Sequence, residues 1–221
     1  GGLDSSSIVY LVNKLLKEQG KEELQETFSS VYKSDGTQEC DESYFIDIMA
    51  LKLGVHSNQI EPKEDEIPSQ IEKMIYMMEN PPESTCMSGW HTFKLVASTD
   101  VKVTLDGQGA DEQLGGYLPY LLNYISSLSI VDMFSQAKKC LQIPNSSKYV
   151  FVGLCLGLYR VLFGEKFLKF TIKNIFKRDF ETNLNKKLGI DTMGSLITLI
   201  HYADHTSMAF SIESRMPFMD Y

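Results

Sequence analysis

The sequence lacks a hydrophobic segment long enough to cross a membrane. Its longest apolar run, from Tyr149 to Tyr159, stops at Arg160, well short of the roughly 20 residues that a membrane helix needs. It also lacks a Cys-x-x-Cys pair, so a zinc site built on such pairs is not expected. Because nothing marks the chain as secreted, we expect reduced thiols and a cytoplasmic protein with no membrane partner. The cysteines are Cys40, Cys86, Cys140 and Cys155.

Positive charge is scarce outside one stretch. Residues 1–137 contain 9 Lys and Arg against 22 Asp and Glu, whereas residues 138–187 contain 11 against 3. An acidic chain, here with a net formal charge of −8, is a poor general binder of nucleic acid, because such binding depends on phosphate neutralisation. We therefore interpret residues 138–187 as basic helix faces in water, with their aliphatic stems packed on the core, and expect no nucleic-acid partner.

Low-complexity tracts and internal repeats are also missing. With 43% hydrophobic and 23% charged residues, the 221-residue chain has a globular composition, which excludes disorder, collagen and coiled coil as its main class. Its length suits one large domain, or a domain with a helical extension. The chain begins at Gly1 without Met and ends abruptly at Tyr221, so we expect a fragment of a longer protein.

Hydrophobic periodicity predicts alternating helices and strands in the first half of the chain. Ser5 to Ser7 are expected to cap the first helix, which Gly20 ends. The alternation implies an α/β fold with a parallel sheet. Beyond Tyr117 the strand signals disappear, so we divide the chain into an α/β part, residues 1–117, and a helical part, residues 118–221. The expected helices are 5–20, 41–53, 71–78 and 90–97, and the expected strands are 27–32, 55–60 and 101–105.

The segment Gly1-Gly2-Leu3-Asp4-Ser5-Ser6 opens directly into the first helix. Glycines let the backbone approach an anion, while a helix start supplies free N–H groups and the positive end of the helix dipole. These features suit a phosphate or pyrophosphate, and Asp4 fits among them if it holds a Mg²⁺ ion that bridges to the phosphate oxygens. A serine cap after a glycine turn is the simpler alternative.

A second acidic, glycine-rich loop follows the best strand. It runs from Leu105 to Glu112 (LDGQGADE) and is closed by Gly115-Gly116-Tyr117. In parallel sheets ligands bind beyond the carboxyl ends of the strands, and neighbouring carboxylates in a tight turn are costly unless they are solvated or paired with a cation. A solvated turn would explain one such loop, but two together favour a magnesium–nucleotide site.

Charged residues also lie close to the end of the chain. Glu213 and Arg215 precede a break at Pro217, where we expect a helix-to-loop exit. The arginine fork there could orient a carboxylate or phosphate, although a structural ion pair is the simpler alternative. His201 and His205 have a spacing that can bind zinc, but no third ligand is evident, so no zinc site is expected.

These motifs resemble those of the glutamine-hydrolysing asparagine synthetase family. The first resembles the body of the Ser-Gly-Gly-x-Asp-Ser pyrophosphate loop of N-type ATP pyrophosphatases, and the second is similar to the second nucleotide loop of these synthetases. The stretch from Tyr202 to Asp220, which includes SIESRMPFMD, is similar to the downstream signature of the family. The resemblance spans residues 1–221 and implies a Rossmann-like parallel sheet of the adenine nucleotide alpha hydrolase type, followed by a mostly helical C-terminal portion.

The resemblance further implies a ligase that uses ATP and Mg²⁺. In asparagine synthetases the side-chain carboxylate of aspartate attacks the α-phosphate of ATP, pyrophosphate leaves, and ammonia derived from glutamine displaces AMP. The implied nucleotide-binding residues are Gly1, Gly2, Leu3, Asp4, Ser5, Ser6, Ser30, Val31, Asp106 and Gly107. The implied metal ligands are Asp4 and Asp111, and the implied catalytic residues are Gln108, Asp111, Glu112, Glu213 and Arg215.

Several departures from the family pattern bear on substrate and partners. The family's glutaminase domain is absent, as are the serine and apolar strand expected before Gly1, so the resemblance implies a glutaminase domain in the same full-length chain and allows a homodimer. Gln108 stands where several asparagine synthetases have glutamate, and glutamine can donate and accept hydrogen bonds but cannot act as a base. In addition, His205 stands where the family often has Arg or Lys, and Phe210 stands where it often has His. The acceptor is therefore open: aspartate, or another carboxylate as in surface-polysaccharide amidotransferases or β-lactam synthetases. A nucleotide-binding scaffold without catalysis is a third alternative.

Overall fold

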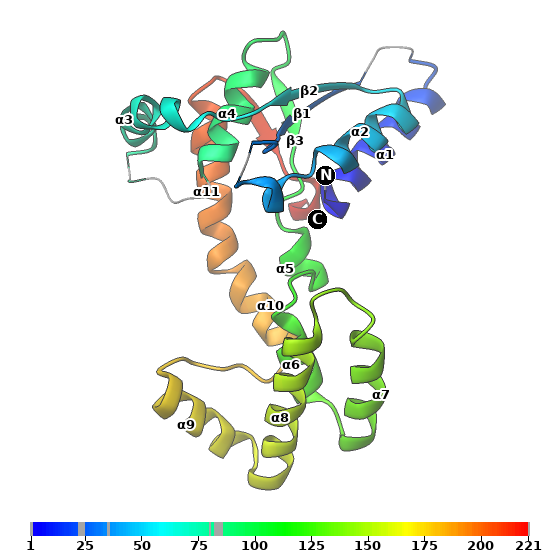
Figure 1. Ribbon diagram of the computed structural model, residues 1–221, viewed down its shortest axis with the longest axis vertical. Coiled ribbons are helices and arrows are strands. Elements are labelled where there is room, and N and C mark those ends of the chain that lie inside the picture. Colours follow the sequence, from blue (N-terminus) through cyan, green and yellow to red (C-terminus); the bar gives the residue numbers. More distant parts are fainter. Residues whose placement is uncertain (1, 22–24, 35, 80, 82–85, 221) are drawn as a thin grey trace. The chain divides into compact units, whose positions relative to one another are not determined.

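The computed structural model describes residues 2–21, 25–34, 36–79, 81 and 86–220 (Figure 1). The chain separates into two compact units: unit 1 is Gly1–Gln108 with Thr198–Tyr221, and unit 2 is Gly109–Ile197. The structural type was predicted to change after residue 117, whereas the compact units change after residue 108 and the chain returns to unit 1 at residue 198.

Unit 1 alternates helices with parallel strands. Strand β1 pairs with β2 from Glu26↔His56 to Ser30↔Ile60, and β3 pairs with β4 from Val103↔Glu213 to Leu105↔Arg215. The predicted α/β class is confirmed, but the described strands form two sheets of two strands each. The helices are α1 (Leu3–Glu18), α2 (Ser43–Leu53), α3 (Ile67–Met78) and α4 (Cys86–Val96), with short 3-10 turns at Gln38–Cys40, Glu64–Glu66 and Pro217–Met219. The strands are β1 (Glu26–Ser30), β2 (His56–Ile60), β3 (Val103–Leu105) and β4 (Glu213–Arg215).

Strand β4 was not predicted. The expected helix-to-loop exit around Glu213 is wrong, because the three-residue segment ESR is extended and pairs in parallel with β3. A strand this short shows no readable alternation, and its conformation depends on a partner about a hundred residues earlier in the chain.

Two apolar clusters position helix α4 in unit 1. In the first, Trp90 is fully buried with Met74 and Met78 of α3, and its indole Nε1–H donates to Gln70 Oε1 at 3.0 Å. In the second, Phe93 and Val96 pack against Ile212, which directly precedes β4. One face of helix α4 therefore packs against α3, and another packs against the residue that leads into β4.

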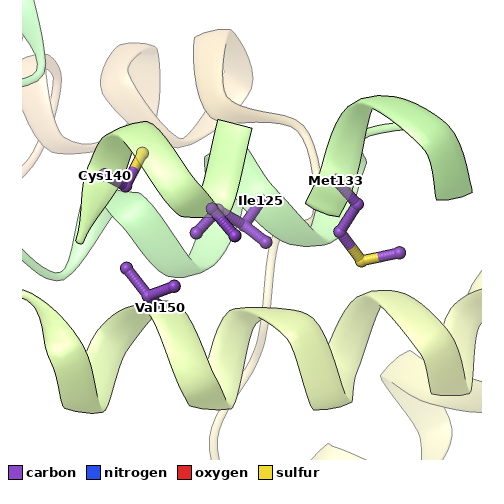
Figure 2. Packing of buried hydrophobic residues seen from close by; sticks show 5 residues of the cluster. Ile125, Met133, Cys140 and Val150 are labelled. Carbon is purple, nitrogen blue, oxygen red and sulfur yellow. The ribbon is translucent and has the colours of Figure 1, made fainter. Parts of the chain in front are cut away.

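Unit 2 consists of helices in its described residues. Ile125, Met133, Cys140 and Val150 form its buried cluster, from α6, α7 and α8 (Figure 2). Two glycines of α8 let these helices approach closely: a Cβ at Gly153 would lie 3.1 Å from Ile125 Cβ, and one at Gly157 would lie 2.4 Å from Met133 Sδ. The helices are α5 (Ala110–Leu114), α6 (Tyr120–Ser127), α7 (Ile130–Cys140), α8 (Ser147–Phe163), α9 (Glu165–Phe176) and α10 (Leu184–Thr192), and α11 (Ser195–Met208) continues into unit 1.

Part of the basic charge of unit 2 is paired with its few acids. Lys169 Nζ lies 2.8 Å from Glu165 Oε1 and 3.4 Å from Glu181 Oε2, and Lys173 Nζ lies 3.0 Å from Asp179 Oδ1. Such partly exposed pairs stabilise a protein little. All four cysteines are free thiols. Within the described residues, every helix is too short or too polar to cross a membrane.

Candidate functional site

Helix α1 begins directly after the first glycine pair. Gly2 is its N-cap in an extended conformation, and no side chain caps the helix, so the predicted serine cap is wrong. The serines lie one turn too late: Ser5 Oγ donates to Gly2 O at 3.3 Å and Ser7 Oγ to Leu3 O at 2.7 Å. Because the first N–H groups of a helix have no intrahelical acceptor, this end of α1 can bind an anion. Gly1 lies outside the described residues.

The loop after β3 is a tight turn around a carboxylate. Asp106 N–H donates to Arg215 O at 2.8 Å, and Asp106 Oδ1 accepts from Gln108 N–H at 3.3 Å. Burial raises the pKa of Asp106 above the ordinary aspartate value, although backbone hydrogen bonds from Gln108 and Gly107 act in the opposite direction. The cost of burying this carboxylate would fall if a ligand donated a hydrogen bond to it.

The two predicted loops of unit 1 meet at Gly107. A Cβ on this glycine would lie 3.2 Å from Asp4 Cβ and 3.2 Å from the backbone nitrogen of Ser5. Only a residue without a side chain fits here without displacing the start of α1. The glycine therefore brings the carboxyl end of β3 against the N-terminus of α1, as ligand-binding crevices of α/β sheets require.

A cavity of about 720 Å³ lies at this junction. Five of the predicted residues line it: Ser5, Ser6, Asp106, Gly107 and Gln108. Polar lining residues that were not predicted come from α4 and α11, and they include Ser88, Thr92 and Thr206. Ser88 and Thr92 are four apart on one helix face, a pattern that could have signalled them, but their direction depends on how α4 packs. The size fits a small-molecule ligand.

Ser30 is the last residue of β1 and Val31 directly follows it, and both are engaged within the protein. Ser30 Oγ donates to Ser88 O at 3.1 Å and lies 2.8 Å from Thr92 Oγ1. Val31 is buried, and its N–H donates to Ile60 O at 2.9 Å. The residues of β1 that line the cavity are the preceding ones, Glu26, Thr27, Phe28 and Ser29. Ser30 therefore contacts α4 and Val31 contacts the end of β2, and their role toward a nucleotide stays a prediction.

In unit 2, a glycine turn also shapes the acidic loop. Gly109 and Gly115, both with positive φ, precede and follow the short helix α5. The N–H groups of Gly115 and Gly116 donate to Asp111 O at 2.9 and 3.0 Å. A Cβ on Gly116 would lie 1.8 Å from Asp111 Oδ1, so the carboxylate of Asp111 occupies space that only glycine leaves free.

Glu112 points away from solvent. Its side chain is 2% exposed, and its Oε1 accepts a hydrogen bond from Tyr117 Oη at 3.0 Å. A buried carboxylate is tolerated where it is hydrogen-bonded. Asp111, its neighbour, is half-buried, so within α5 it is the carboxylate more available to a ligand.

The donor set agrees with a magnesium site shared with a phosphate. Mg²⁺ is usually bound by one or two carboxylates together with substrate phosphates and water, and Asp4 and Asp111 supply carboxylates beside glycine turns. No group of three or more His, Cys, Asp or Glu side chains comes together among the described residues. The pairing of Asp4, in unit 1, with Asp111, in unit 2, remains a prediction.

Glu213 and Arg215 lie on the same face of β4. Arg215 Nε–H donates to Glu213 Oε1 at 2.8 Å. The pair lowers the pKa of Glu213 and raises the pKa of Arg215. Arg215 is paired with Leu105 in the sheet, directly before Asp106, so this exposed ion pair lies beside the loop that lines the cavity.

The family comparison covers the whole chain. A family model described as asparagine synthase matches residues 1–221, and no curated protein gives a significant match. The matched family consists of ATP-using ligases.

Proposed function

Because the chain belongs to the asparagine synthase family, we propose that it adenylates the side-chain carboxylate of aspartate for attack by ammonia derived from glutamine. The products would be asparagine, AMP and pyrophosphate. The observation that supports this most is the contact of Gly107 with Asp4 and Ser5 beside the cavity, since it joins an anion-binding helix start to a strand-end loop.

The start of α1 would hold the phosphates of ATP. Its uncapped N–H groups and the hydroxyls of Ser5 and Ser6 would bind the pyrophosphate, and Gly2 would let the backbone approach it. When bound through Asp4 and Asp111, Mg²⁺ would neutralise the charge that develops on the leaving pyrophosphate. The contacts to the pyrophosphate would strengthen as the bond between the α-phosphorus and the leaving pyrophosphate oxygen breaks. They would therefore stabilise the transition state more than bound ATP.

The cavity would take the nucleoside part of the adenylate. Phe28 and Thr27 of β1 and Val101 before β3 line it, and Asp106 and Gly107 would lie near the AMP portion. Gln108 would hydrogen-bond the reacting carboxyl group. The exposed Glu213–Arg215 pair would orient the acceptor carboxylate, for which an arginine fork is well suited.

A second candidate is an amidotransferase that activates another carboxylate, in surface-polysaccharide or β-lactam-type chemistry. The observation that favours it is Gln108, which cannot take a proton from ammonia as a glutamate would. Phe210, which stands where the family often has His, packs edge-on against Trp90 with ring centroids 4.6 Å apart. Its side chain is therefore part of the apolar core of unit 1. A glutaminase domain in the full-length chain and a homodimer are part of the proposal in either case.

The test is ATP–pyrophosphate exchange by the full-length protein with aspartate as the acceptor. We expect aspartate-dependent exchange that Asp4→Asn reduces by about 10²–10³-fold and that Asp100→Asn, at an exposed acid of the same unit, leaves intact. Exchange with another carboxylate but not with aspartate would favour the second candidate. No exchange with any carboxylate would leave a nucleotide-binding scaffold.

A further inference from the structure

Unit 2 contains a chain of side-chain contacts, made of hydrogen bonds and one aromatic ring contact, that the proposed mechanism does not use. It joins three helices, α5, α6 and α10, and passes from Glu112 through Tyr117 and Tyr120 to Asp191 and Lys187. Helix α10 packs against both α5 and α6. Each contact lies inside unit 2, so the arrangement is a property of that unit alone.

The α10 end of the chain is a charge-assisted anchor. Asp191 Oδ1 accepts from Lys187 Nζ at 2.6 Å, and its other oxygen, Oδ2, accepts from Tyr120 Oη at 2.9 Å. Tyr120 is 4% exposed, and burial together with Asp191 raises the pKa of its phenol above the ordinary tyrosine value. The phenol therefore stays protonated at any physiological pH and keeps donating its hydrogen bond to Asp191.

The α5 end of the chain reaches the acidic loop. The rings of Tyr120 and Tyr117 are 5.7 Å apart, and Tyr117 Oη donates to the buried carboxylate of Glu112 at 3.0 Å. Glu112 adjoins Asp111, whose carbonyl receives the two N–H groups of the glycine turn. Rotation of α5 about its axis would break the Glu112 contact and would move the Asp111 carboxylate out of the space beside Gly116.

We propose that Asp191 and Tyr120 are positioning residues, which hold Tyr117 and Glu112 and thereby keep the carboxylate of Asp111 oriented for a divalent cation bound with nucleotide. The inference rests on the proposed function, because it takes Asp111 as a metal ligand. Residues that orient a metal ligand typically affect metal affinity by about 10–100-fold when they are replaced.

The test uses the full-length protein with Tyr120→Phe, Asp191→Asn and the double variant. One readout is Mn²⁺ binding in the presence of a non-hydrolysable ATP analogue, followed by electron paramagnetic resonance. The other is the half-saturating Mg²⁺ concentration in ATP–pyrophosphate exchange, separated from the rate at saturating Mg²⁺. We expect each single variant to weaken Mn²⁺ binding and to raise the half-saturating Mg²⁺ about tenfold, with little change in the saturated rate. The double variant should be no worse than Asp191→Asn alone, because both substitutions act on the Tyr120–Asp191 hydrogen bond and only Asp191→Asn also weakens the contact with Lys187.

The matched control is Asp179→Asn, at a well-exposed acid of unit 2 that also pairs with a lysine. It should leave both metal readouts unchanged. A lower melting temperature of Tyr120→Phe or Asp191→Asn with unchanged Mn²⁺ affinity would overturn the proposal, since it would show a purely structural role. If the wild type binds Mn²⁺ with the analogue but exchanges no pyrophosphate, a weaker Mn²⁺ affinity of the variants still supports positioning, while the proposed function fails.

Discussion

The two units place their acidic residues in opposite kinds of surroundings. In unit 1, Asp4 lies in the first turn of an uncapped helix beside a cavity of about 720 Å³. In unit 2, the carboxylate of Asp111 occupies the space that a Cβ on Gly116 would need, and its neighbour Glu112 is buried. Unit 1 therefore provides space and free donors, whereas unit 2 provides one carboxylate whose direction is fixed.

The largest expected effect tests whether the two carboxylates serve one metal. Asp111→Asn should reduce ATP–pyrophosphate exchange by about 10²–10³-fold, the cost typical of losing one electrostatic contact to developing charge. Asp4→Asn should cost a similar factor. If both hold the same ion, the double variant should lose little more than either single one. Multiplicative losses in this cycle would mean that the two units act independently.

A glycine substitution in each unit sharpens the comparison. Gly116→Ala forces Asp111 to move, because the new Cβ would lie 1.8 Å from its Oδ1, and it should raise the half-saturating Mg²⁺ about 10–100-fold. Gly107→Ala meets its neighbours only at 3.2 Å and should cost less. Gly189→Ala, in α10 with nothing within 4 Å of the new Cβ, is the control in the same assay. Equal effects of the two substitutions would contradict the larger role expected for the space beside Gly116.

Core packing should also differ between the units. Gly157→Ala places a Cβ 2.4 Å from Met133 Sδ and 3.3 Å from Ser126 Cα. Overpacking of this kind costs about 1–3 kcal/mol, which the better helix propensity of alanine offsets by up to about 1 kcal/mol. We expect a lower melting temperature of the unit 2 transition in scanning calorimetry. Gly89→Ala in unit 1, whose nearest contact is a Thr206 methyl group at 4.0 Å, should be neutral or slightly stabilising.

The smallest effect concerns the half-buried carboxylate of Asp106. Because burial raises its pKa in the folded state, the folded protein holds this proton more tightly than the unfolded chain does. Stability therefore falls as the pH rises from the ordinary aspartate pKa through the raised one, and it stays lower above that. Asp106→Asn should raise the melting temperature at pH 7 by a few degrees and have little effect below the ordinary aspartate pKa. A rise in melting temperature that is the same at every pH would show that the raised pKa of Asp106 is not the cause.

Much of the local structure of unit 1 could be predicted from its sequence. Helices and strands appear at the expected places around α1, α2, β1, β2 and β3. The two helices have a periodic apolar pattern followed by a glycine, and residues 101–105 alternate before a glycine turn, whereas β2, with the sequence HSNQI, has only a weak strand signal. The expected glycine loops do border the cavity, through Ser5, Ser6, Asp106, Gly107 and Gln108. The start of α1 was misread because serines that could cap a helix also fit its first turn, where their hydroxyls bond to preceding carbonyls.

By itself, then, the amino-acid sequence determined most of the helical and extended segments of unit 1 other than β4, where glycine permits a tight turn, and which family the motifs resemble, since these depend on neighbouring residues. The tertiary structure alone decided that Gly107 touches Ser5, that Glu213 and Arg215 belong to a strand, and that Asp191 bonds to Tyr120. Each of these contacts joins residues far apart in the chain. Their geometry follows from how helices and strands pack, and no local pattern of side chains records it.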